Sequence, residues 1–141
     1  MLLVNVAATL FMVGVIWFVQ VVHYPLFTRV GEEDFPNYAT AHARLTGLVV
    51  GPPMLLEAAT AIALVFSRPH GVPVPLPWAG LGLVVVIWLS TAILQSPRHT
   101  ELGHGFDPAT HRVLVASNWL RTASWSLRGI LVLVMVSEAA G

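Results

Sequence analysis

Four long apolar stretches decide what this chain can fold into. They cover about residues 2–22, 46–66, 78–95 and 108–136. Because a helix needs about 20 mostly apolar residues to cross the hydrocarbon core of a bilayer, each stretch predicts one membrane-spanning helix. In lipid, backbone polar groups must be bonded internally, which leaves helices and closed barrels as spanning structures. We therefore predict one all-α domain over residues 1–141, an integral membrane four-helix bundle.

The composition supports this fold class and excludes several functions. Hydrophobic residues make up 56% of the 141 residues and charged residues only 10%, whereas soluble domains carry roughly 25% charged residues. Seven basic residues balance seven acidic ones, and no basic patch indicates nucleic-acid binding. The absence of cysteine excludes disulfides and iron–sulfur clusters, so a metal would need ligands such as histidine or carboxylate.

The ends and connections of these stretches carry further information. The first stretch lacks the positive region of a signal peptide and is longer than an apolar signal core, so we expect it to remain as a span. Acidic residues at positions 32–34 predict a short extra helix in the first connection. That helix either lies at the membrane interface or leads directly into the second span. Asp107 and Pro108 predict the N-cap and first residue of the fourth helix.

An even number of spans places both termini on one side of the membrane and the first and third connections on the other. Five of the six histidines fall on or beside that second side: His23, His42, His99, His104 and His111. The same side also has more arginines in its connections: Arg29, Arg44, Arg98 and Arg112, against Arg68 opposite. The positive-inside rule then predicts that the histidine side faces the cytoplasm, and we expect the membrane to be the cell membrane.

Two charged residues lie deep inside the predicted spans. At about 1.5 Å per residue, Glu57 lies about 16 Å into the second span and Arg121 lies about 14 Å beyond Arg112. Because an unpaired charge in hydrocarbon costs several kcal/mol, these similar depths predict an ion pair between Glu57 and Arg121. Two interpretations of the pair stay open. It can lock the helices together, or Glu57 can accept a proton while Arg121 positions an oxygen of a ligand.

The polar residues around this predicted pair are candidates for a functional site. The candidates for catalysis are Glu57, His23 and His99 as acid–base groups and Arg121 as the residue that positions an oxygen of the ligand. The candidates for substrate contact are Tyr38, Gln95, Asn118 and Trp125. Histidine is the commonest metal ligand in proteins, and the candidate ligands for copper, iron or haem are His23, His42, His99 and His111. The alternatives are structural: amides bond neighbouring helices, and aromatic residues form the belt at the membrane interface.

Two short stretches carry a resemblance to a known family. Residues 118–122 read Asn-Trp-Leu-Arg-Thr and residues 95–99 read Gln-Ser-Pro-Arg-His. They resemble the Asn-x-x-Arg-Thr and Asn-x-Pro-x-Asn stretches of the anthrone-oxygenase-like family of small four-span membrane proteins. Gln95 and His99 stand in place of the two asparagines. The resemblance implies a four-helix membrane fold and oxidation of a hydrophobic aromatic substrate.

Three classes of function fit these features. The first is a membrane oxidoreductase or oxygenase-like enzyme that acts on a lipophilic small molecule, with histidine and Glu57 as acid–base groups or metal ligands. The second is a non-catalytic metal- or haem-binding membrane protein. The third is an accessory subunit or small transporter of a membrane complex, in which the polar core serves assembly or permeation. Membrane lipid is a partner in each, and the small bundle is compatible with a homo-oligomer.

Overall fold

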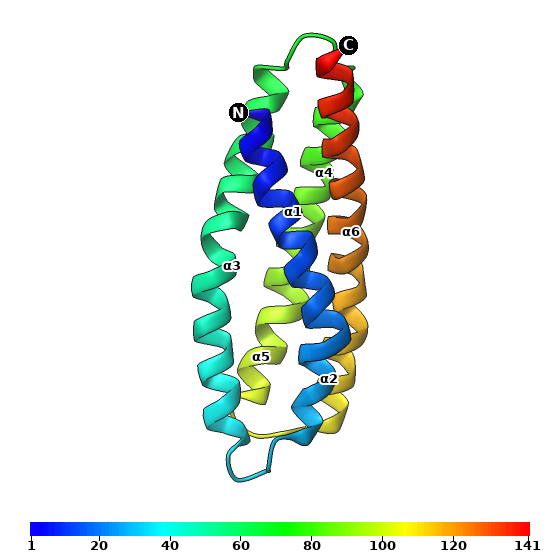
Figure 1. Cartoon of the computed structure of the whole chain (residues 1–141). Coiled ribbons are helices and arrows are strands. Elements are labelled where there is room, and N and C mark those ends of the chain that lie inside the picture. Colours follow the sequence, from blue (N-terminus) through cyan, green and yellow to red (C-terminus); the bar gives the residue numbers. More distant parts are fainter.

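The computed structural model describes residues 1–141 as a bundle of four long helical rods (Figure 1). The first rod consists of α1 (Leu2–Phe18), the π-helical turn η1 (Val19–His23), α2 (Tyr24–Leu26) and the 3-10 turn η2 (Phe27–Arg29). The second rod is α3 (Phe35–Phe66). The third consists of α4 (Pro75–Ser90), the π-helical turn η3 (Thr91–Gln95) and α5 (Ser96–Leu102), and the fourth is α6 (Pro108–Ala140).

This architecture confirms the predicted all-α bundle of four membrane-spanning helices. The rods Leu2–Arg29, Phe35–Phe66, Pro75–Leu102 and Pro108–Ala140 are each long and apolar enough to cross a membrane. Both termini lie at one end of the bundle, together with the connection 67–74 (Figure 1). The connections 30–34 and 103–107 lie at the opposite end (Figure 1). We call this second end the histidine end, because five of the six histidines lie in its connections or in the helix segments next to them.

The helices extend further at the histidine end than the sequence predicted. Of the two alternatives for the helix in the first connection, the structure confirms that it leads directly into the second span: it is the first part of α3, which begins at Phe35 and continues through Pro52 and Pro53. Residues 96–102, predicted as a loop, form α5. At about 1.5 Å per residue α3 is roughly 48 Å long, against about 30 Å for the hydrocarbon core. The histidine end therefore reaches into the interfacial region of the membrane.

The start of α6 follows the predicted capping pattern. The Asp107 side chain accepts a hydrogen bond from the backbone N–H of Thr110 at 2.7 Å, and Pro108 occupies the first helical position. This bond satisfies one of the N–H groups that a helix start leaves without a partner. Hydrogen bonding to Thr110 also lowers the pKa of the Asp107 carboxyl below its usual value. The cap therefore fixes where the fourth rod begins.

Apolar side chains fill the bundle in three successive clusters. The cluster at the histidine end includes Phe27, Phe35, Leu102 and Leu114. The central cluster is formed by Met12, Ile16, Met54, Ile87 and Trp125. The cluster nearest the termini is formed by Leu64, Val72 and Met135. Many large apolar side chains also point outward, as expected of helices whose outer faces contact lipid rather than water.

Candidate functional site

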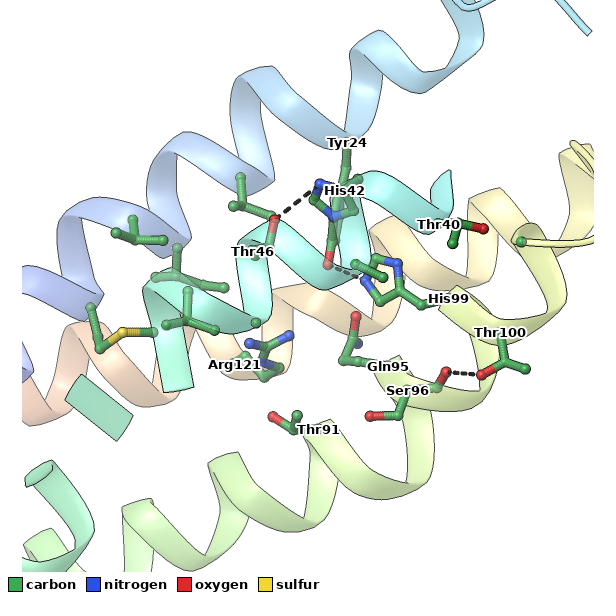
Figure 2. A pocket seen from close by; sticks show the side chains of 18 of the residues that line it. Tyr24, Thr40, His42, Thr46, Thr91, Gln95, Ser96, His99, Thr100 and Arg121 are labelled. Atoms are coloured by element: carbon green, nitrogen blue, oxygen red, sulfur yellow. Dashed lines mark hydrogen bonds between the residues drawn. The ribbon is translucent and has the colours of Figure 1, made fainter. Parts of the chain in front are cut away.

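A cavity of about 560 Å³ lies in the half of the bundle nearest the histidine end (Figure 2). Its apolar wall includes Met12, Val15, Ile16, Val19 and Val50. Its polar wall includes Tyr24, His42, Gln95, His99 and Arg121. Ligand sites of about 300–1,000 Å³ with mostly apolar walls and a few convergent polar groups are typical of small-molecule binding. The cavity therefore has the size and the lining of a site for a lipophilic small molecule.

The cavity is open between α3 and α5. The exposed residues of its lining there are Thr40, Ala43 and Gly47 on α3 and Ser96 and Thr100 on α5. A Cβ atom added to the exposed Gly47 would meet nothing within 4 Å. A hydrocarbon core of about 30 Å, measured along α3 from Phe66, ends near Thr46. The opening therefore lies at the edge of the hydrocarbon core, where an amphiphilic molecule can approach from the bilayer.

A tyrosine–histidine pair faces this cavity. The Tyr24 hydroxyl lies 2.9 Å from Nε2 of His99, and Figure 2 shows the two side chains pointing toward each other from different rods. His111 donates from Nε2 to the backbone carbonyl oxygen of Tyr24 at 2.8 Å. That bond holds α2 against α6 and fixes the position of the tyrosine. A phenol and an imidazole at this distance can exchange a proton directly.

A pair of histidines, His23 and His42, leads from the cavity toward the histidine end of the bundle. Nε2 of His23 lies 2.8 Å from Nδ1 of His42, and the Thr46 hydroxyl lies 3.1 Å from the same Nδ1. The rings of His42 and His99 have their centroids 5.3 Å apart. His42 lines the cavity whereas His23 does not. The three imidazoles therefore form a short series of titratable groups between the cavity and the histidine end.

These histidines do not form a metal-ligand set. No group of three or more histidine, aspartate or glutamate side chains is arranged to hold a metal ion. His23 and His42 are hydrogen-bonded to each other, while His99 and His111 bond the side chain and backbone of Tyr24. The predicted copper, iron or haem site at His23, His42, His99 and His111 therefore gains no support from this arrangement.

Two π-helical turns, η1 and η3, flank the cavity on opposite rods. Each carries a buried glutamine that donates to α6. Gln20 Nε2 donates to the carbonyl oxygen of Val115 at 3.2 Å, and Gln95 Nε2 donates to Oγ of Ser117 at 2.8 Å. A π-turn inserts an extra residue and rotates the helix that follows, and such turns are frequent at functional sites. Here they precede the segments that carry Tyr24 and His99.

Arg121 brings a positive charge to the cavity wall. Its side chain is 8% exposed and forms no salt bridge within 4.0 Å. Nη1 lies 3.4 Å from Oδ1 of Asn118, the guanidinium carbon lies 5.2 Å from the ring centroid of Trp125, and Nε has no hydrogen-bond partner. Oε1 of Gln95, another residue of the wall, also lacks a partner. Figure 2 shows both side chains bordering the same space.

The predicted ion pair between Glu57 and Arg121 is wrong. Glu57 Oε1 instead lies 2.8 Å from Nε of Arg128, and both side chains are 1% exposed. The Thr9 hydroxyl donates to Oε1 at 2.7 Å, and the Trp125 indole donates to Oε2 at 3.0 Å. The prediction counted the depth of Glu57 from about residue 46, whereas α3 begins at Phe35. Counted from the observed helix starts at about 1.5 Å per residue, Glu57 lies about 33 Å along α3 and Arg128 about 30 Å along α6, against about 20 Å for Arg121. Packing brings Arg128 level with the carboxylate.

The Glu57–Arg128 pair belongs to a network that joins all four rods. Arg128 Nη2 donates to Oδ1 of Asn5 at 3.1 Å and to Oγ1 of Thr9 at 3.2 Å. Arg128 Nη1 donates to the carbonyl oxygen of Gly80 on α4. A Cβ atom on Gly80 would lie 3.2 Å from that nitrogen, so the glycine permits the close approach. The network satisfies every polar group it contains, as a stabilising element of a membrane bundle requires.

The structure divides the predicted site residues into two groups. Those that line the cavity are His42, Gln95, His99 and Arg121. Those that do not are His23, Tyr38, Glu57, His111, Asn118 and Trp125. Asn118 donates to Oε1 of Gln20 at 2.9 Å, and Tyr38 packs against Phe27 with ring centroids 5.5 Å apart.

Sequence reasoning left two important residues outside the predicted site. Tyr24 directly follows His23 in the sequence, and its buried hydroxyl faces the cavity. Arg128 follows Arg121 by seven residues, which keeps it on the same helix face. That spacing was the available sign that Glu57 had a second candidate partner.

Comparisons with family models, with curated proteins and with solved structures found no match. The class of the protein therefore rests on its own fold. Four rods that can cross a membrane, packed around a buried polar network, define an all-α integral membrane protein. The resemblance to the anthrone-oxygenase-like family stays a prediction.

Proposed function

We propose that this protein is an integral membrane enzyme that removes a proton from a lipophilic small molecule held in the cavity. The observation that carries the proposal is the hydrogen-bonded pair of Tyr24 and His99, which faces the same cavity as the unpaired guanidinium of Arg121. An acid–base pair and a fixed positive charge on one mostly apolar wall supply the two elements of proton abstraction beside an oxygen-bearing group.

The Tyr24–His99 pair can act as a relay. The tyrosine oxygen takes a proton from the substrate while its own proton passes to Nε2 of His99, 2.9 Å away. The Tyr24–His99 pair thus gains one proton, and the substrate keeps the electron pair of the broken bond and carries a negative charge. His99 then returns the proton to water near the histidine end. His104 lies there: it is exposed and also lines the cavity.

Arg121 holds the substrate in place for this transfer. Its guanidinium lines the cavity and can donate to an oxygen atom of the substrate, and its charge is fixed, since arginine stays protonated in proteins. A donor set in place before the reaction requires no reorganisation when charge develops. Glu57 lies outside the cavity with both carboxylate oxygens occupied, so we assign it to fold stability rather than to catalysis.

The oxidoreductase or oxygenase-like character of the reaction rests on the resemblance described from the sequence. Removal of a proton from carbon leaves an electron-rich carbanion, and an external acceptor such as dioxygen can then take electrons from it. The residues of the cavity account for the proton transfer alone. The oxidant comes from outside the protein.

Isotope exchange tests the proton transfer across many candidate substrates at once. Purified protein in detergent or nanodiscs is incubated in D₂O with a panel of lipophilic carbonyl compounds, with and without a carboxylate, and deuterium incorporation is measured by mass spectrometry. We expect the protein to accelerate exchange for part of the panel. Because a positioned acid–base group contributes about 10²–10⁴-fold, Tyr24→Phe and His99→Gln should lower that rate by roughly this factor. Oxygen uptake by the same mixtures tests the oxidation.

The control for this experiment is His70→Gln, which removes an exposed histidine at the opposite end of the bundle. It should leave the exchange rate unchanged. Exchange that persists at the wild-type rate in both Tyr24→Phe and His99→Gln would contradict the assignment of the relay. Absence of exchange across the whole panel would contradict the proposed reaction.

A further inference from the structure

The charge on Arg121 has no counter-charge anywhere in its surroundings. The side chain forms no salt bridge, and none of the 19 residues that line the cavity is an aspartate or a glutamate. Its neighbours are the Asn118 amide, the Tyr24 hydroxyl and the face of Trp125, which are polar or polarisable but neutral. A charge held in this way within a membrane bundle is costly, and ionisable groups in such positions commonly mark ligand sites.

The nearest candidate for a counter-charge, Glu57, is fully engaged elsewhere. Its two oxygens accept hydrogen bonds from Arg128, Thr9 and Trp125. Trp125 also separates the two charged centres, because its indole N–H bonds the carboxylate while its ring face meets Arg121. The bundle therefore holds one neutralised arginine and, seven residues earlier on the same helix, one arginine without compensation.

From this contrast we infer that the ligand of the cavity is a lipophilic carboxylate, a single compact anion on an apolar body, whose head group binds Arg121. The inference rests on the proposed function in that both place the ligand in this cavity, and it names the class of molecule. A carboxylate matches the planar guanidinium and carries one charge for the one unpaired arginine. The apolar body covers Met12, Ile16 and Val50 and extends through the opening between α3 and α5.

The guanidinium of Arg121, which lines the cavity, is the anchor for the carboxylate. The access route agrees with this class of ligand, since a membrane amphiphile keeps its head group near the edge of the hydrocarbon core. The exposed small residues Ala43 and Gly47 line the opening at about that level. Such a molecule can therefore enter the cavity from the bilayer without first dissolving in water.

Matched acid and ester probes test the inference. Protein is reconstituted in phosphatidylcholine nanodiscs, which carry no net charge, and titrated with a fluorescent polyene fatty acid or with its methyl ester. Energy transfer from the five tryptophans reports binding that saturates. We expect the acid to bind at least about tenfold more tightly than the ester, the lower end of what a buried charge-assisted hydrogen bond contributes.

Variants locate the preference. Arg121→Gln should reduce the ratio of ester to acid Kd to about one, and Arg121→Lys should retain part of it. The matched control is Arg112→Gln, which removes the same charge from an exposed position on the same helix and should leave the ratio unchanged. A melting curve of Arg121→Gln close to that of the wild type shows that a lost preference is not caused by unfolding.

Equal binding of acid and ester to the wild-type protein, or no saturable binding of either, would overturn the inference without any variant being needed. A preference that survives in Arg121→Gln would also overturn it. Failure of the proposed reaction has a different signature. The acid would bind selectively through Arg121, while no compound of the panel would exchange its hydrogen for deuterium.

Discussion

The two buried arginines of α6 lead to opposite predictions for stability. Arg128 is neutralised by Glu57 at 2.8 Å inside a bundle where both side chains are 1% exposed. Glu57→Gln leaves that guanidinium buried and unpaired, and breaking one side of a buried ion pair costs about 3–5 kcal/mol. The loss corresponds to roughly 10²–10⁴ in the folded-to-unfolded ratio, at about 1.4 kcal/mol per tenfold change.

Arg121→Gln should cost much less, because no carboxylate loses its partner. The variant gives up a long contact to Asn118 and a cation–π contact to Trp125, the second worth about 0.5–2 kcal/mol, and it removes an uncompensated charge from the bundle. We expect a net change within about 1 kcal/mol of the wild type, because the lost contact and the relieved burial of charge offset each other.

Reversible unfolding in mixed dodecyl maltoside and SDS micelles, followed by tryptophan fluorescence, measures both effects. The Glu57→Gln/Arg128→Gln double variant should be more stable than the sum of the two single losses predicts, because the removal of both charges leaves neither unpaired. Equal losses in Arg121→Gln and Arg128→Gln would refute this reasoning, since they would mean that Glu57 interacts with both arginines alike.

Three further predictions concern the ends of the bundle. The folded-state pKa of Asp107 is lowered, so its cap stabilises the fold at pH values above the unfolded-state pKa of about 3.9. This stabilisation is lost as the pH falls through the folded-state pKa, and Asp107→Ala should abolish that pH dependence in unfolding titrations. Gly71→Ala should lower stability by about 1–3 kcal/mol, because φ is +80° and a Cβ would clash with the backbone carbonyl of Glu138; a wild-type melting temperature would contradict this. Since the chain has no cysteine, single cysteines in Glu33→Cys and His70→Cys report the orientation of the bundle in the membrane. An impermeant maleimide added to intact cells should label only the cysteine at position 70. Labelling only at position 33 would contradict a cytoplasmic histidine end.

The sequence was sufficient to predict the fold because the lengths of the apolar runs leave few alternatives in a membrane. The even number of spans also follows from the sequence, and with it the gathering of histidines at one end. The Asp107 cap was readable from the residue pair Asp-Pro. These features depend on local pattern or on counting, and neither depends on how the helices rotate against one another.

The partner of Glu57 could not be predicted by the same means. Arg121 and Arg128 lie two turns apart on one face of α6, and choosing between them requires the axial offset of α3 against α6. The π-turns η1 and η3 are similarly invisible to a periodic pattern that assumes regular helices, yet they precede the segments that carry Tyr24 and His99. Depth counted from the ends of the apolar runs therefore selected Arg121, which lies about 10 Å from Arg128 along α6 at about 1.5 Å per residue.

The central claim is that Arg121 is held free at the wall of a ligand cavity beside the Tyr24–His99 pair. An experimental density map of the protein purified with its membrane lipids, at a resolution that places side chains, tests it most directly. The account predicts non-protein density in the cavity, with an oxygen atom within hydrogen-bond distance of Arg121. A cavity closed by side chains, or Arg121 paired with Glu57, would contradict it.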